Sequence, residues 1–115
     1  MKKILIVDDD LNWQKVWNMR LGKKVILFSA FSVDEAEKIF AEHNDIDLIA
    51  MDACVPGDEI NTKPLIKKFR ETFNGPMIAI SKSSLNRECL VKAGCNYESE
   101  KEWLHGNVLR ILRLI

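Results

Sequence analysis

The side chains with the clearest chemical potential are carboxylates that directly follow short apolar runs. Asp8–Asp10 follow the run Lys3–Val7, and Asp52 follows the run Asp47–Met51. If these acids converge, they repel one another and their pKa values rise unless a cation neutralises them. Mg²⁺ suits such a place, because it prefers one or two carboxylates together with waters and phosphate oxygens. The pattern therefore predicts a magnesium site.

A hydroxyl and an amine can reach the same place. Ser81 ends the apolar run that begins at Met77, and Lys101 follows the last predicted strand. Carboxylates, a metal, a hydroxyl and an ammonium together describe a site for a phosphoryl group, with Asp52 available as the nucleophile. Taken singly, each has a simpler interpretation: Asp10 as a helix cap, Ser81 as a strand-end residue bonded to backbone, and Lys101 as a solvated charge among glutamates.

Five strand-helix pairs are predicted to position these residues. Apolar, β-branched runs predict the strands, and the last of them is placed mainly by the rhythm of the chain: 3–7, 24–29, 47–52, 77–81 and 95–99. Apolar residues at helical spacing, with caps such as the Ser32–Glu35 box, predict the helices: 11–21, 32–43, 61–73, 84–94 and 103–115.

The repeated strand-helix pattern predicts an α/β fold, a doubly wound five-stranded parallel sheet with helices on both faces. The favoured strand order is 2-1-3-4-5. In this order strands one and three are neighbours about 4.8 Å apart, so that Asp8 and Asp9 lie beside Asp52 at the carboxyl edge, where such sheets bind ligands.

Length and composition narrow the classes of protein. A chain of 115 residues fits a single domain, and 17 basic residues balance 17 acidic ones, so no net charge favours nucleic acid or a membrane surface. The three cysteines lack metal-ligand spacing and suit free thiols in a reducing compartment. No segment has membrane-spanning length or the form of a signal peptide, so we expect a cytoplasmic protein.

The motifs Ile4–Asp10, Asp47–Asp52 with Pro56-Gly57, Pro76–Ser81 and Lys101 resemble, in order and spacing, the receiver domain of two-component response regulators. The resemblance covers essentially the whole chain. It implies a flavodoxin-like fold in a single stand-alone receiver domain, 1–115, with no output domain, similar to the chemotaxis regulators.

The resemblance also implies a function. Asp52 would accept a phosphoryl group from a histidine kinase or histidine phosphotransfer protein, and the signal would pass to a downstream protein at the face of the fourth helix, fifth strand and fifth helix. Such a domain is no enzyme beyond its own phosphorylation and dephosphorylation. The matching positions are Asp52 as phosphoacceptor, Ser81 as switch hydroxyl, Lys101 as phosphoryl-pairing amine, and Asp8, Asp9, Asp52 and the backbone carbonyl of Cys54 as Mg²⁺ ligands.

Several positions depart from the family pattern, among them Ile60, which stands where the family often has a glycine. Lys82 stands after the switch hydroxyl, where the family usually has a small residue, and could cover or contact the phosphoryl site. Glu102 replaces the common proline after Lys101, so we expect an ordinary trans peptide bond there. Glu98 occupies the aromatic switch position and Tyr97 lies one residue early, on the opposite side of the strand, which predicts an altered relay.

Two alternatives are left open. One is a receiver-like binding module with a degenerate switch and no phosphorylation. The other, less favoured, is a haloacid-dehalogenase-like phosphatase with Asp8 as nucleophile and Asp10 as general acid, although no later acidic pair follows Ser81. A flavodoxin-type FMN carrier is disfavoured more simply, because its phosphate would meet three acids.

Overall fold

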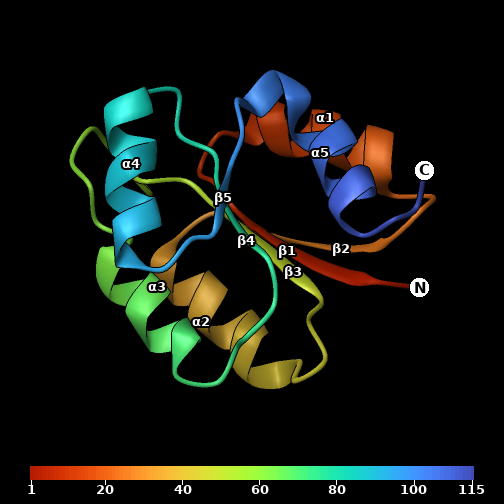
Figure 1. The fold of residues 1–115 in the computed structure, drawn as a ribbon, viewed down its shortest axis with the longest axis horizontal. Coiled ribbons are helices and arrows are strands. Elements are labelled where there is room, and N and C mark those ends of the chain that lie inside the picture. The colour runs from red at the N-terminus through yellow and green to blue at the C-terminus, as the bar shows by residue number, and fades with distance from the viewer.

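The computed structural model describes residues 1–115 and contains one parallel sheet of five strands in the order β2-β1-β3-β4-β5 (Figure 1). The strands are β1 Lys3–Val7, β2 Ile26–Ala30, β3 Leu48–Met51, β4 Met77–Ala79 and β5 Tyr97–Glu98. The predicted fold class and strand order are confirmed.

Helices cover both faces of the sheet, α1 and α5 on one side and α2, α3 and α4 on the other (Figure 1). Their bounds are α1 Leu11–Leu21, α2 Val33–Glu42, α3 Lys63–Arg70, α4 Ser84–Ala93, the 3₁₀ turn η1 Lys101–Trp103, and α5 Leu104–Ile111. None of these helices is long and apolar enough to cross a membrane.

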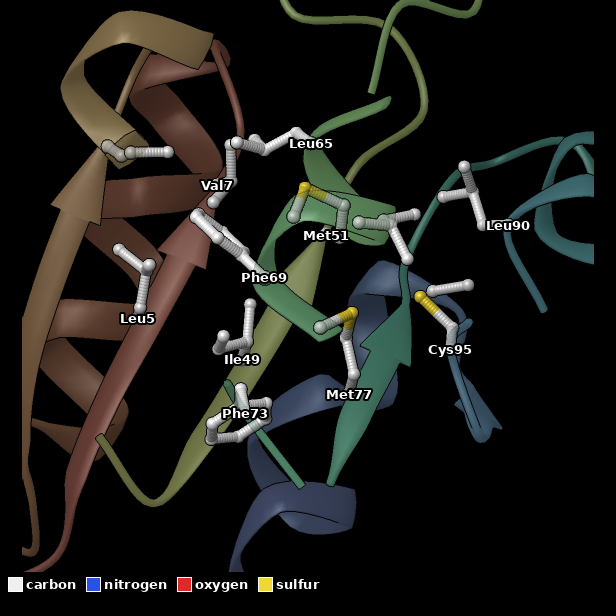
Figure 2. Packing of buried hydrophobic residues seen from close by; sticks show 14 of the residues in the cluster. Leu5, Val7, Ile49, Met51, Leu65, Phe69, Phe73, Met77, Leu90 and Cys95 are labelled. Carbon is white, nitrogen blue, oxygen red and sulfur yellow. The ribbon is translucent and has the colours of Figure 1, made fainter. Parts of the chain in front are cut away.

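The central strands are buried on both faces, which explains why their sequences lack polar alternation. Leu5 of β1, Ile49 of β3 and Met77 of β4 point toward Phe69 of α3 and Leu90 of α4 (Figure 2). Their sequence neighbours point the other way, into a second core with α1 and α5 that includes Ile4, Ile6, Leu48, Ala50 and Ile78.

Short polar side chains begin three of the helices. Asp10 accepts hydrogen bonds from the backbone N–H groups of Asn12 and Trp13, so the interpretation of Asp10 as a helix cap is confirmed. Ser32 accepts from the N–H of Glu35 at the start of α2. Ser83 caps α4 in the same way.

The two predicted helices 61–73 and 103–115 are too long. Helix α3 begins only at Lys63, because the residues before it bind the preceding loop, and it ends at Arg70. Helix α5 ends at Ile111, where Arg113 takes a left-handed conformation (φ 58°) and the N–H of Leu114 bonds back to Leu109, a Schellman ending. At the other end, Trp103 lies in η1 before α5 begins, and its side chain is exposed rather than part of the buried stripe.

Replacing Phe69 tests the core between β3 and α3. Phe69 is 1% exposed and stacks on Phe40, so Phe69→Ala should lower the free energy of unfolding by about 3–5 kcal/mol. Leu85→Ala on α4, where the side chain is 73% exposed, should change it by less than about 0.5 kcal/mol. Urea denaturation followed by circular dichroism measures both, and equal losses would contradict the assigned core.

Candidate functional site

The carboxyl ends of β1 and β3 bring three carboxylates together. The strands β1 and β3 are neighbours in the sheet, and Val7 and Met51 are register partners on them (Figure 1). Asp8 and Asp52, the next residues of the two strands, therefore follow neighbouring strand ends. Carboxylate oxygens of Asp8, Asp9 and Asp52 all lie within 4.8 Å of one another. The structure thus produces the convergence that the strand order predicts.

Lys101 completes this cluster from the start of η1. Its Nζ lies 2.7 Å from Asp8 Oδ2 and 3.7 Å from Asp52 Oδ2, and its side chain is only 6% exposed. The simpler interpretation of Lys101 as a solvated charge is therefore wrong, because the ammonium is buried between two carboxylates.

Ser81 and Lys82 approach from the loop after β4 and line a pocket with Asp9, Asp52 and Lys101. Ser81 is buried, and its Oγ accepts a hydrogen bond from the N–H of Ser83 at 3.3 Å. This leaves the hydroxyl proton of Ser81 free to be donated to a ligand. Lys82 is exposed at the rim, so the pocket remains open beside it.

Burial and mutual repulsion control the charges in the cluster. Burial, followed by the nearby Asp8 carboxylate, raises the pKa of Asp52 to about 6. Burial also raises the pKa of Asp8. Although burial alone would lower the pKa of Lys101, the hydrogen-bonding and charge of Asp8 and the charge of Asp52 raise it, so the amine stays protonated.

The cluster fits a hard divalent cation. Asp8 Oδ2 is fully buried and lies 2.7 Å from the Lys101 ammonium, which is the one positive charge in ion-pair contact with these three carboxylates, so negative charge remains uncompensated. The donors are all oxygens from Asp8, Asp9 and Asp52, and Asp9 is exposed, so that coordinating waters have room. Such a donor set matches Mg²⁺. Cys54 also lines the pocket, and its carbonyl oxygen accepts no hydrogen bond from the protein.

Thr62 is a site residue that the sequence analysis missed. Its buried hydroxyl donates to the carbonyl oxygens of Asp52 at 2.7 Å and Ala53 at 3.1 Å, and it fixes the backbone just after β3. The neighbouring Asn61 side chain bonds both the N–H and the carbonyl of Val55. A Thr-Pro pair two residues apart before an amphipathic helix is the only sequence signal for this anchor.

Gln14 is a second missed residue. It lies on the inner face of α1 and is 1% exposed, and its Nε2 lies within hydrogen-bonding distance of the carbonyl oxygens of Ile6, Asp8 and Ala30. These carbonyls are at the ends of β1 and β2, so Gln14 fixes the strand ends that present Asp8. The sequence signal for this role was that Gln14 is a polar residue on the helical stripe that also contains Trp17 and Leu21.

Glu98 makes an ionic contact at the position where the family has an aromatic residue. Arg87 of α4 bonds Glu98 Oε1 at 3.0 Å through Nε and the carbonyl oxygen of Ser81 at 2.8 Å through Nη1. Tyr97 is 42% exposed and takes no part in this contact. The peptide bond between Lys101 and Glu102 is trans, as predicted.

No family model and no curated protein sequence matches the chain. Solved structures do. A two-component response regulator from Clostridium difficile is 26% identical, with a TM-score of 0.80 over 98% of this chain and 97% of that one. The BeF₃-activated receiver domain of RstA from Klebsiella pneumoniae is 25% identical, with a TM-score of 0.79 over 98% and 97%.

The response regulator TrrA from Thermotoga maritima, solved with Mg²⁺ and BeF, is also 25% identical, with a TM-score of 0.80 over 96% of this chain and 99% of that one. Over nearly its full length the chain is therefore similar to response-regulator receiver domains, and the predicted resemblance is confirmed. This similarity, together with the acidic pocket, implies a role in phosphorylation-dependent signalling.

Replacing Asp52 tests the electrostatic strain in the cluster. Because the pKa of Asp52 is raised from 3.8 to about 6, ionisation disfavours the folded state; the penalty is absent below about pH 4 and complete above about pH 6. In EDTA at pH 7, Asp52→Asn should therefore raise the free energy of unfolding by about 1–3 kcal/mol. At pH 3.5 the gain should vanish.

Urea denaturation at both pH values measures this difference. Asp58→Asn, at the exposed rim of the same pocket, serves as the control and should leave stability nearly unchanged. A loss of stability in Asp52→Asn at pH 7 would contradict the assigned repulsion.

Proposed function

We propose that this chain is a receiver whose Asp52 accepts a phosphoryl group from a histidine kinase or histidine phosphotransfer protein. The observation that carries the proposal is the buried Lys101 ammonium between Asp8 and Asp52, beside Asp9 and an open pocket. Burying charged groups is unfavourable, and solvated acids at this edge would serve a purely structural role at lower cost in free energy. The burial of these charges beside an open pocket therefore favours a functional role.

In the proposed reaction, a carboxylate oxygen of Asp52 attacks phosphorus in line, the bond from phosphorus to the donor breaks, and its electron pair leaves with the donor. Asp52 must be ionised to attack. Asp8, Asp9, Asp52 and the Cys54 carbonyl would hold Mg²⁺, which, when bound, favours the ionised carboxylates and neutralises phosphoryl oxygens.

Two further side chains act on the phosphoryl oxygens in this proposal. Lys101 pairs with one of them, exchanging part of its contact with Asp8 for the new negative charge. Ser81 donates a hydrogen bond from its hydroxyl to another phosphoryl oxygen, which draws the loop after β4 toward Asp52. Lys82 at the rim adds a positive charge on the path that a donor takes.

The signal then leaves the site through α4 and β5. The phosphoryl group stabilises a conformation in which the Ser81 loop has moved, and partners prefer that conformation. Arg87 joins this loop to Glu98, so the face formed by α4, β5 and α5 is the proposed surface for a downstream protein. We further propose that residues 1–115 act as one receiver in the cytoplasm, without nucleic acid or membrane as a partner.

The two alternatives make different demands on the site. A phosphatase of the haloacid-dehalogenase type needs Asp10 as a free general acid, but the side chain of Asp10 caps α1. A binding module without phosphorylation would have the same fold and the same site. Only a test of whether Asp52 accepts a phosphoryl group distinguishes it from a receiver.

Phosphorylation is tested by intact-protein mass after treatment with acetyl phosphate and Mg²⁺. We expect the wild-type chain to gain one phosphoryl group, and EDTA to prevent the gain, because ionised Asp52 and the donor both require neutralisation. Asp52→Asn should gain none, and Asp58→Asn, the matched change at the rim, should still react. No gain in the wild-type chain would leave the binding module as the better description.

The ionic link to β5 is tested by NMR with beryllofluoride and Mg²⁺ as a phosphoryl mimic. We expect amide resonances at Ser81 and Glu98 to shift together in the wild-type chain. Arg87→Gln should reduce the shift at Glu98 by at least about twofold, because it removes the contact that joins the two segments. Lys92→Gln, on the exposed side of the same helix, is the control. An unchanged shift at Glu98 in Arg87→Gln would contradict the link.

A further inference from the structure

The backbone of Lys101 lies in a short 3₁₀ turn that no proline rigidifies. The carbonyl oxygen of Lys101 accepts the N–H of Leu104 within this turn, and Glu102 follows in an ordinary trans linkage. The Lys101 ammonium nevertheless has to stay within contact distance of Asp8 and Asp52. Something outside the turn must therefore fix its position.

Trp17 of α1, 84 residues earlier in the chain, makes a contact that fixes the backbone of Lys101. Its indole N–H donates to the carbonyl oxygen of Lys101 at 3.3 Å, and no other side chain bonds the backbone of η1. Trp17 is itself 0% exposed, packs with Leu104 and Val108, and stacks on Trp13 with ring centroids 5.6 Å apart. The donor is thus held rigidly.

The position of Trp17 relative to Gln14 gives this contact its significance. The two residues are three apart on α1 and face the same way. Gln14 bonds the carbonyl oxygen of Asp8, and Trp17 bonds the carbonyl oxygen of Lys101. One helix face therefore holds the backbones of both partners of the buried ion pair, and sets where Lys101 lies relative to the acids.

A second set of contacts holds the segment just before η1 from the side of α5. Asn107 donates to Ser99 Oγ at 2.7 Å, and Ser99 Oγ donates to the carbonyl oxygen of Glu100 at 2.7 Å. Lys101 is therefore fixed from α5 on one side and from α1 on the other. Among these side chains, only Trp17 of α1 bonds the backbone of Lys101 itself.

We infer that Trp17 is a positioning residue for phosphoryl transfer, acting through its indole N–H on the backbone of Lys101; this inference rests on the proposed function. Trp17 touches neither the phosphoryl group nor a metal ligand side chain. Its effect is geometric, since displacement of a charged group by about 1 Å can cost up to about a hundredfold in rate.

Trp17→Phe removes the N–H and keeps an aromatic ring, and Trp13→Phe is the matched control, one turn away on the same helix without a bond to Lys101. With acetyl phosphate at saturating Mg²⁺, we expect Trp17→Phe to lower the maximal phosphorylation rate about tenfold and to leave the half-saturating donor concentration within about twofold. Trp13→Phe should stay within about twofold in both.

A double-mutant cycle with Lys101→Met separates positioning from a general loss of structure. If Trp17 acts through Lys101, Trp17→Phe should change the rate by less than about twofold once Lys101 is replaced. Equal losses in both backgrounds, or a Trp17→Phe rate like that of Trp13→Phe, would overturn the inference. If Trp17→Phe does not fold, a benzothiophene analogue of tryptophan at position 17, with Trp13 and Trp103 replaced by Phe, keeps the ring size and removes the N–H.

NMR of the Lys101 side chain makes the test independent of phosphorylation. The ¹³Cε resonance of Lys101 should move toward that of an exposed lysine in Trp17→Phe and stay in place in Trp13→Phe. An unmoved Lys101 resonance in Trp17→Phe would overturn the inference, whether or not the wild-type chain is phosphorylated. Failure of the wild-type chain to accept a phosphoryl group, with the Lys101 resonance moved in Trp17→Phe, would count against the proposed function alone.

Discussion

The structure depends on a balance between buried acids and one buried amine at the end of the central strands. Asp8 and Asp52 repel each other where water is scarce, and Lys101 is the only cation close enough to offset them. The balance is incomplete, because one ammonium faces three carboxylates and the pKa of Asp52 remains raised. A site with excess negative charge favours the binding of a cation. This excess distinguishes the cluster from a structural ion pair, in which the two charges balance.

Backbone carbonyl contacts keep that unfavourable arrangement in place. Gln14 fixes the end of β1, Thr62 the turn after β3, Arg87 the loop after β4, and Trp17 the turn that carries Lys101. Three of the donors lie in helices and Thr62 directly precedes α3, and each acceptor lies at the carboxyl edge of the sheet. The helices therefore do more than cover the core: their polar inward residues hold the loops that present the charged groups.

The strands, their order and the location of the site could be predicted from the sequence, because local patterns of apolar residues indicate where each strand runs and ends. Apolar runs that stop on Asp8, Asp52 and Ser81 locate the site, since parallel strands deliver their ends to one edge. Helix ends were less predictable: the Schellman turn at Arg113 depends on a left-handed residue with no glycine to mark it. The contacts of Trp17 and Gln14 were not predicted either. Both join segments far apart in the chain, and a buried tryptophan at helical spacing is explained equally well by packing alone.

The contact between Arg87 of α4 and Glu98 of β5 is ionic, so its strength depends on the salt concentration. Arg87 is mostly buried, whereas half of the Glu98 side chain faces water. A contact of this kind weakens as dissolved ions screen it, whereas apolar packing is not weakened by screening. The contact that joins the loop after β4 to the edge strand β5 is therefore expected to weaken as ionic strength rises.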